Sequence, residues 1–403
     1  MIPTRRFGRT ELPMPLLSLG GMRFQQSWSD LEQSAIEAES QRNLEATLAA
    51  AVEAGFHHVE TARYYGTSEL HLGPALVRHP DPKRILQTKI PPREDPAQFE
   101  AELQRSFELL GVQRVDLLAV HGLNLAEHLE QTLRPGGCLD VLRRWQAEGA
   151  IGHVGFSSHG PLELLLEAIA SDAFDYINLH WYYIRQHNDP ALTAARERDM
   201  GVFLISPTDK GGHLHTPSAR LQQLCAPLHP IVFNDLFCLS DPRVHTISVG
   251  AARPSDLDLH LQAVQQLDQA EQLVPGIAEQ LQQGLEERLG REWLTQWQEG
   301  LPAWSDTPGD LNLPVMLWLH TLHQGWELES FCQARYGLLG SGSHWFPGRN
   351  ANRFEAGEDE PDAVSEAELL SVLEHSPIRH QIPTILRQLK QRFGGKQVKR
   401  LGP

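Results

Sequence analysis

The sequence predicts a (β/α)8 barrel, and three observations support this fold class. Apolar runs of strand length alternate with amphipathic segments of helical length over about 265 residues, which is the size of one such barrel. Polar or charged residues directly follow most of these runs, as expected where parallel strands end at a barrel mouth. No GxGxxG motif follows the first predicted strand, so the alternative of a doubly wound open sheet is disfavoured.

The predicted strands are short runs of mainly aliphatic residues. Such runs suit the strands of a parallel sheet, because these are covered by helices on one face and by the core on the other. In chain order the predicted strands are Leu16–Gly20, His57–Glu60, Ile85–Lys89, Asp116–Val120, His153–Phe156, Tyr176–Leu179, Val202–Ile205 and Thr246–Val249.

The segments between the strands carry the end signals of helices. Leu44–Ala54, Pro96–Leu110 and Leu139–Glu148 each precede a glycine, the residue that most easily adopts the left-handed conformation after a helix. A proline near the start suits the first turn of three further predicted helices. These are Pro161–Ala170, Ala191–Met200 and Pro254–Val264.

The alternation ends near residue 268, and a second domain is predicted beyond it. We expect the barrel to occupy residues 1–268 and a smaller, mostly helical domain to occupy residues 269–403. A Gln- and Glu-rich helical stretch, Gln265–Gly300, spans this boundary, and the second domain closes with a basic helix, Ile382–Phe393. The acidic tract Glu355–Glu368 is expected to be a flexible loop, because it holds too few apolar residues to pack.

The composition excludes several classes of function. A net charge of −16 leaves no basic face for nucleic acid. No signal peptide is visible and no apolar run approaches about 18 residues, so no membrane partner is expected. Four scattered cysteines (Cys138, Cys225, Cys238 and Cys332) fit reduced thiols of a cytoplasmic protein better than zinc ligands or disulfides. A protein partner is not indicated.

Chemically useful side chains lie at the ends of consecutive predicted strands. Glu60, Lys89 and His121 end or follow strands two to four, and Tyr65 comes five residues after Glu60. Since parallel strands end at one mouth, we expect these groups to converge. Together they can deliver a proton to a carbonyl oxygen: the ammonium is expected to lower the tyrosine pKa and the carboxylate to hold the ammonium. The histidine can orient the carbonyl.

Each of these residues also has a structural interpretation. Taken alone, His121 fits a hydrogen-bonded core histidine, Lys89 a solvated strand end and Tyr65 a turn residue packed on the rim. The serines that follow strand five, Ser157 and Ser158, could simply cap a helix. The occurrence of all the groups at successive strand ends favours a shared site.

The segment VETARYYG at residues 59–66 resembles the DTAxxYG motif of the aldo-keto reductases. QTKI and VDLLAVHG resemble the segments in which that family keeps a lysine and a histidine, and the resemblance extends over residues 5–266. It implies that Tyr65 is the proton donor, that Lys89 adjusts its pKa, that Glu60 is the partner of Lys89, and that His121 orients the substrate.

The same resemblance implies a nicotinamide cofactor, NADPH or NADH, bound without a Rossmann fold. GFSSHG resembles the family's strand-five motif, so Ser157, Ser158 and Asn178 are expected to hold the nicotinamide carboxamide. Ser206 lies in the segment that would contact the cofactor after strand seven. Arg253, in SVGAARPSD, would meet a 2′-phosphate.

Two departures from the family pattern stand out. Glu60 replaces the usual aspartate and is one methylene longer, which could move the lysine contact by about 1 Å and slow the chemistry. The segments LNLPVMLWLH and HQIPTILRQL resemble an appended domain that holds an iron–sulfur cluster in one bacterial branch. Only Cys332 lies in this region, whereas a [4Fe–4S] cluster needs four thiolates, so no iron–sulfur cluster is expected.

We therefore predict an oxidoreductase that reduces an aldehyde or ketone with NAD(P)H, or runs the reverse oxidation. One alternative is a barrel with weak or no activity that serves as a nucleotide-binding or partner-docking scaffold. Another is a metal-dependent hydrolase that uses some of the 20 histidines, such as His57, His58, His180 or His213. It is disfavoured because no HxH lies on the first strand and because adjacent strand residues point to opposite faces.

Overall fold

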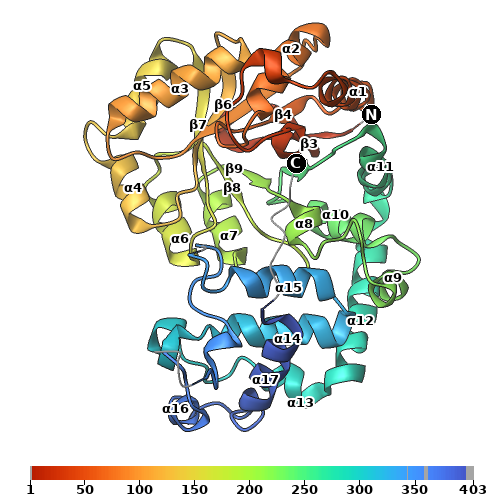
Figure 1. Ribbon diagram of the computed structural model, residues 1–403. Coiled ribbons are helices and arrows are strands. Elements are labelled where there is room, and N and C mark those ends of the chain that lie inside the picture. The colour runs from red at the N-terminus through yellow and green to blue at the C-terminus, as the bar shows by residue number, and fades with distance from the viewer. Residues whose placement is uncertain (1, 343, 358–361, 396–403) are drawn as a thin grey trace. The chain divides into compact units, whose positions relative to one another are not determined.

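The computed structural model describes residues 2–342, 344–357 and 362–395, and these form two compact units (Figure 1). The first unit contains residues 2–211 and 231–271. The second contains residues 212–230 together with the described residues from 272 onward. A short segment from the middle of the chain is thus part of the same compact unit as the C-terminal helices.

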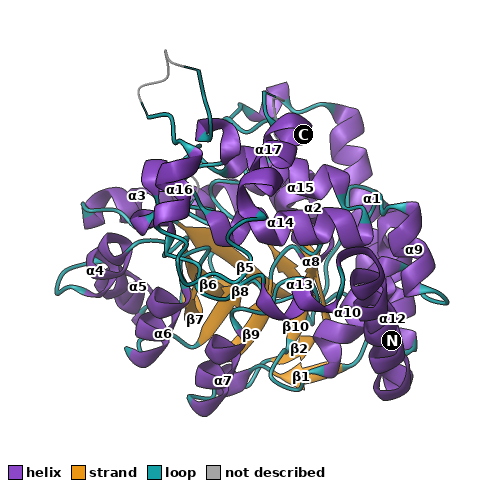
Figure 2. Cartoon of the chain, turned by 90° about the horizontal axis from the view of Figure 1, so that it is seen from below, coloured by secondary structure: helices purple, strands orange, loops and turns teal. Residues whose placement is uncertain are grey.

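Eight parallel strands close into a barrel in the first unit, so the predicted fold class is confirmed. The strands follow one another around the barrel in chain order, and the last pairs with the first. Figure 2 shows these strands inside a surrounding layer of helices. They are β3 (Leu17–Gly20), β4 (His58–Glu60), β5 (Ile85–Ile90), β6 (Val115–His121), β7 (Ile151–Ser157), β8 (Tyr176–Leu179), β9 (Gly201–Leu204) and β10 (Thr246–Val249).

The helices of the first unit follow the predicted alternation. The helix α3 has the predicted bounds because Asp95 accepts a hydrogen bond from the Ala97 amide at 2.9 Å and Gly111 ends the helix with φ +65°. The helices are α1 (Ala38–Ala54), α2 (Ser68–Arg78), α3 (Pro96–Leu110), α4 (Ala126–Leu133), α5 (Cys138–Ala147), α6 (Leu162–Ala170), α7 (Asp189–Glu197), α8 (Pro207–Lys210), α10 (Pro230–Ser240) and α11 (Asp258–Gln265).

The sequence did not predict the helix α2, because Gly73 and Pro74 interrupt its helical pattern. The structure explains the glycine: a Cβ atom at position 73 would lie 2.5 Å from the carbonyl oxygen of Leu109 in α3. Close packing between the two helices therefore outweighs the low helix propensity of this pair of residues.

A two-stranded hairpin, β1 (Thr4–Arg6) and β2 (Pro13–Pro15), lies at the N-terminal end of the barrel. The fully buried ring of Phe7 packs 5.6 Å from the ring of Tyr176, at the start of β8, and 5.6 Å from that of His245. Gly201, at the start of β9, leaves room for it, since a Cβ atom there would lie 2.6 Å from the Phe7 ring. Phe7 thus plugs the end of the barrel opposite the strand C-termini.

The second unit is helical. Its helices are α9 (Ala219–Cys225), α12 (Ala270–Leu289), α13 (Arg291–Gln296), α14 (Leu313–Trp326), α15 (Glu329–Leu338), α16 (Glu366–Ser371) and α17 (Ile382–Phe393). The closing helix α17 has the predicted bounds. None of the helices in the described part of the chain combines the length and the apolar character needed to cross a membrane.

The predicted loop at Glu355–Glu368 is wrong at its C-terminal end. The helix α16 begins inside the tract because Ser365 and Glu368 form a capping box, in which each side chain bonds the backbone of the other residue. Residues 358–361 of this tract lie outside the described part of the chain.

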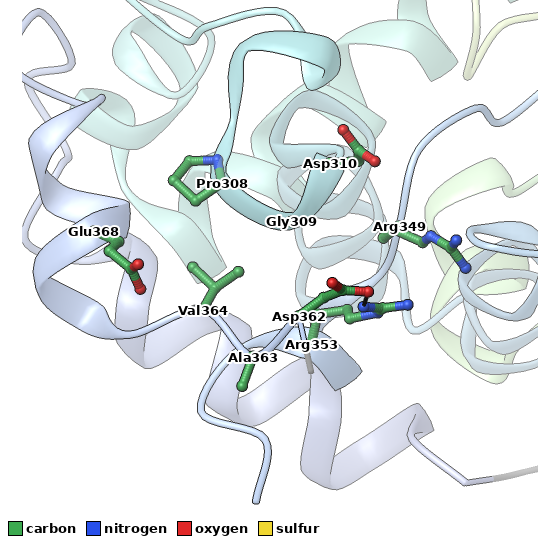
Figure 3. Close-up of a pocket in the computed structure, with 9 residues that line it drawn as sticks. All are labelled: Pro308, Gly309, Asp310, Arg349, Arg353, Asp362, Ala363, Val364 and Glu368. Atoms are coloured by element: carbon green, nitrogen blue, oxygen red, sulfur yellow. Dashed lines mark hydrogen bonds and ion pairs between the residues drawn. The ribbon is translucent and has the colours of Figure 1, made fainter. Parts of the chain in front are cut away.

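The second unit contains a charged pocket of about 310 Å³ (Figure 3). Arg353 and Asp362 form an ion pair at its wall, so part of its charge is neutralised internally. The pocket is lined by Pro308, Gly309, Asp310, Arg349, Arg353, Asp362, Ala363, Val364 and Glu368.

Phe7→Ala tests the plug at the N-terminal end of the barrel. Removing a fully buried ring leaves a cavity, so the free energy of unfolding should fall by about 3–5 kcal/mol in urea denaturation. Val77→Ala on α2 is the control, because Val77 is 77% exposed and should change stability by less than about 0.5 kcal/mol. Equal effects of the two substitutions would contradict a buried plug.

Candidate active site

Glu60, Lys89 and Tyr65 converge at the C-terminal ends of β4 and β5. The Lys89 side chain is 1% exposed, and its Nζ atom donates hydrogen bonds to Glu60 Oε2 and, at 2.8 Å, to the carbonyl oxygen of Thr61. The same nitrogen lies 4.7 Å from the centroid of the Tyr65 ring. Glu60 therefore still holds Lys89 in spite of its extra methylene.

The chain after β4 brings Tyr65 back to Lys89. The Thr61 amide donates to the carbonyl oxygen of Gln87 at 2.9 Å and the Arg63 amide to that of Lys89 at 3.0 Å, so this segment runs alongside β5. The turn then closes at Gly66, which has φ +54°. A Cβ atom at position 66 would lie 1.9 Å from the carbonyl oxygen of Ser27, so this turn requires glycine.

His121 ends β6 beside the same tyrosine. The two rings lie 5.7 Å apart with an interplanar angle of 87°, an edge-to-face arrangement. The four residues predicted from strand ends therefore lie together at one mouth of the barrel.

The electrostatics of the site keep Tyr65 protonated. Burial and the Glu60 carboxylate raise the pKa of Tyr65 to about 12, and the Lys89 ammonium lowers it only in part. The ammonium therefore acts in the expected direction, but burial and Glu60, which the sequence analysis did not weigh, outweigh it. Burial alone would lower the pKa of Lys89, but Glu60 and Tyr65 together raise it. At neutral pH the site thus holds a charged amine beside a neutral phenol.

His121 is held neutral. Burial, then the positive charges of Lys89 and Lys210, lower the pKa of His121 to about 3. A neutral imidazole can still donate one hydrogen bond through its N–H group, and it does so without adding a charge to the site.

Asn178, at the end of β8, has the most open hydrogen-bonding capacity of the predicted cofactor residues. Its side chain is fully buried, and neither amide atom has a hydrogen-bond partner among the described residues. An amide offers both a donor and an acceptor, so Asn178 fits a ligand group with the same complement, such as a carboxamide.

The two predicted serines after β7 are buried and already engaged. Ser157 Oγ accepts a hydrogen bond from the Gly122 amide at 3.0 Å. Ser158 Oγ donates to the carbonyl oxygen of Leu123 at 2.5 Å and accepts from the Gly160 amide at 2.9 Å. Both hydroxyls therefore hold the loop that follows β6, and Ser158 also stabilises the turn after β7.

Ser206 and Arg253 lie elsewhere on the loops of the barrel. Ser206 precedes α8 in the left-handed conformation, with φ 55° and ψ 44°. Arg253 follows β10, its side chain is 73% exposed, and it donates to Asp256 Oδ1 at 3.1 Å. These two residues are not among the groups that contact Tyr65 or Lys89.

A chain of hydrogen bonds across the ends of β7, β8 and β9 was missed in the sequence. His159 Nδ1 and His180 Nε2 lie 2.5 Å apart, and His180 Nδ1 lies 2.5 Å from Tyr182 Oη. Tyr182 Oη then donates to the carbonyl oxygen of Ile205. We refer to His159, His180 and Tyr182 as the imidazole relay. His180 directly follows β8 and His159 comes two residues after the end of β7, which is the signal that could have identified the relay.

The direction of the relay follows from its last bond. Because the Tyr182 hydroxyl gives its proton to a carbonyl, it must accept from His180 Nδ1–H, which leaves His180 Nε2 to accept from His159 Nδ1–H. Lys210 Nζ, at the end of α8, lies 3.4 Å from both His159 Nδ1 and His180 Nε2. Burial and the Lys210 charge hold the pKa of His180 well below its usual value, so His180 is neutral.

The histidines considered for metal binding have other partners. His57 Nδ1 pairs with Asp81 at 2.8 Å, whereas His58 Nδ1 lies 2.6 Å from Ser18 Oγ. The described residues contain no group of three or more His, Cys, Asp or Glu side chains that could hold a metal ion. In the second unit, Cys332 is buried and its thiol donates to the carbonyl oxygen of Leu319 at 3.4 Å.

Comparisons with known proteins identify the family of the barrel domain. The sequence model of the Aldo/keto reductase family matches residues 16–270, which is more than half of the chain. The fold is similar to that of aldo-keto reductase AKR11C1 from Bacillus halodurans, at 18% identity and a TM-score of 0.54 over 68% of this chain and 96% of that one.

Two further solved structures have a similar fold. The thermostable aldo-keto reductase Tm1743 gives 19% identity and a TM-score of 0.55, over 67% of this chain and 99% of that one. PA4992 from Pseudomonas aeruginosa, assigned to the aldo-keto reductases, gives 22% identity and a TM-score of 0.52, over 67% of this chain and 95% of that one.

The raised pKa of Tyr65 predicts a pH dependence. Because the folded state favours the neutral phenol, Tyr65 contributes stability that is fully present below about pH 10, its ordinary pKa, and is lost as the pH rises toward 12. The phenolate absorbance of the wild-type protein, minus that of Tyr65→Phe, should therefore show no ionisation below about pH 10. A phenolate that appears near pH 9 and is abolished by Tyr65→Phe would contradict the assignment.

Proposed function

The chain belongs to the aldo/keto reductase family of NAD(P)H-dependent oxidoreductases, and we propose that it reduces an aldehyde or ketone or oxidises the corresponding alcohol. The observation that carries this proposal is the Lys89 ammonium, fixed by Glu60 and placed against a protonated Tyr65. A phenol in this position can give its proton to a carbonyl oxygen. The ammonium then stabilises the phenolate that forms.

Each residue of the site has one role in this proposal. A reduced nicotinamide, when bound, would supply the hydride for the carbonyl carbon. Tyr65 supplies the proton to the carbonyl oxygen. Lys89 lowers the cost of the phenolate, and Glu60 keeps Lys89 charged and in place. His121 is neutral and offers its N–H group to the same carbonyl oxygen, which fixes the orientation of the substrate.

The proposed cofactor is NADPH, with NADH as the alternative. Asn178 is proposed to hold the nicotinamide carboxamide, which is supported by its buried amide with no partner among the described residues. Ser157 and Ser158 would position the turn beside it, and Ser206 would contact the cofactor after β9. Arg253 has an exposed guanidinium that could pair with a 2′-phosphate. We place the protein in the cytoplasm, where its four free cysteines would remain reduced.

Tyr65→Phe tests the proton donor. The substitution removes only the hydroxyl, so kcat for NADPH-dependent reduction of an aldehyde panel should fall by about 10²–10⁴-fold while NADPH binding is retained. Tyr64→Phe is the matched control, because Tyr64 is the adjacent tyrosine in the sequence and its side chain is 50% exposed. No turnover of any aldehyde, ketone or quinone by the wild-type protein would favour a non-catalytic scaffold.

Asn178→Leu and Arg253→Ala test the cofactor contacts by fluorescence titration. Asn178→Leu should weaken NADPH and NADH alike by about tenfold, since both carry the carboxamide. It should not lower the free energy of unfolding, because the amide has no partner to lose among the described residues. Arg253→Ala should weaken NADPH alone. A loss of stability in Asn178→Leu with unchanged cofactor affinity would contradict the assigned role.

A further inference from the structure

The Glu60 carboxylate has a second partner, on the oxygen atom that does not bond Lys89. Its Oε2 atom accepts from Lys89, while its Oε1 atom accepts a hydrogen bond from Ser248 Oγ at 3.3 Å. Ser248 lies on β10 and is 6% exposed, and Glu60 is 3% exposed. Each oxygen of the buried carboxylate therefore has its own donor, which fixes the rotation of the carboxylate plane.

This contact reaches across a whole strand. Glu60 on β4 is paired in register with Gly20 on β3, and β3 in turn pairs with β10. A Cβ atom at position 20 would lie 2.6 Å from Ser248 Oγ and 3.3 Å from Glu60 Oε1. Any larger residue at position 20 would therefore occupy the space through which Glu60 and Ser248 meet.

We propose that Ser248 is a positioning residue for the Glu60–Lys89–Tyr65 site, and that Gly20 is glycine so that the contact between Ser248 and Glu60 can form. The proposal rests on the proposed reductase function for its catalytic consequence. A glutamate side chain has one more rotatable bond than an aspartate. The second hydrogen bond removes that extra freedom.

The chemistry depends on where the carboxylate points. With Ser248 on Oε1, only Oε2 faces Lys89, so the ammonium keeps hydrogen atoms for the Thr61 carbonyl and for the Tyr65 hydroxyl. Without Ser248, both carboxylate oxygens can turn toward the ammonium and compete with the tyrosine for it. The phenolate formed during proton transfer would then be less well stabilised.

Ser248→Ala is the first test. A hydrogen bond of 3.3 Å is long, so kcat should fall by about 2–10-fold while KM for NADPH and for the aldehyde stays the same. Ser248→Thr keeps the hydroxyl and should restore most of the activity. The matched control is Thr88→Val, which deletes an equally buried hydroxyl that donates to another carboxylate, Glu69 Oε1, at 2.6 Å. Its kcat should stay within about twofold of wild type.

A double-mutant cycle with Glu60→Asp identifies the partner. The shorter aspartate cannot reach both Lys89 and Ser248, so Ser248→Ala should change kcat by less than about twofold in the Glu60→Asp background. The same fold-change in both backgrounds would overturn the proposal, because Ser248 would then act independently of Glu60.

Gly20→Ala is a second test, in which Ser248→Ala is expected to raise kcat instead of lowering it. The added Cβ atom forces the Ser248 hydroxyl to move, so Gly20→Ala should lower kcat, and Ser248→Ala in the same chain should restore part of it by removing the atom at 2.6 Å. If the two losses of kcat instead multiply in the double variant, the proposal that Gly20 leaves space for the Ser248–Glu60 contact is overturned.

The free energy of unfolding of the variants tests this proposal even if the proposed function fails. If the wild-type protein reduces no carbonyl compound, the proposed function fails. The Ser248–Glu60 cycle is then read from the free energy of unfolding in urea. Non-additive effects of Ser248→Ala and Glu60→Asp on this free energy would support the contact without any activity measurement, and additive effects would overturn it.

Discussion

A buried ion pair constrains the mouth of this barrel. Lys89 and Glu60 are each almost completely excluded from solvent, and placing two such charges in the interior costs several kcal/mol per ion before their attraction is counted. Apolar residues would pack the same space at lower cost. The pair is stabilised further because the Thr61 carbonyl accepts a hydrogen bond from Lys89 and the Ser248 hydroxyl donates one to Glu60. Such an arrangement, placed at strand ends beside a tyrosine, is better explained by chemistry than by stability.

The ion pair also determines the protonation of its neighbours. Glu60 and burial keep Tyr65 neutral, and the positive charge of Lys89 acts with that of Lys210 to keep His121 neutral. Tyr65 and His121 are therefore both neutral hydrogen-bond donors at physiological pH. A carbonyl oxygen placed between them would meet two donors and one nearby cation, which is the environment that a developing oxyanion requires.

The sequence predicted most of the barrel and the central residues of the site, because both depend on local patterns. Apolar runs identified all eight barrel strands, and the residues that end or follow these runs include Glu60, Lys89 and His121. The features that the sequence did not reveal depend on contacts between residues that are far apart in the chain. The net pKa of Tyr65 follows from burial, which no motif encodes. Ser248 meets Glu60 only because β10 closes the barrel beside β3, and 188 residues separate the two in the chain.

The imidazole relay is a second buried polar network, at the ends of β7, β8 and β9. It ends on the carbonyl oxygen of Ile205, and the next residue, Ser206, has a left-handed backbone that costs a non-glycine residue on the order of 1–3 kcal/mol. Lys210 approaches the relay from the other end of the same short helix, so both ends of the Ser206–Lys210 turn are fixed. A protein that only needed to connect β9 to α10 could use an unstrained loop. The left-handed conformation of Ser206 persists here because these contacts fix the turn at both ends.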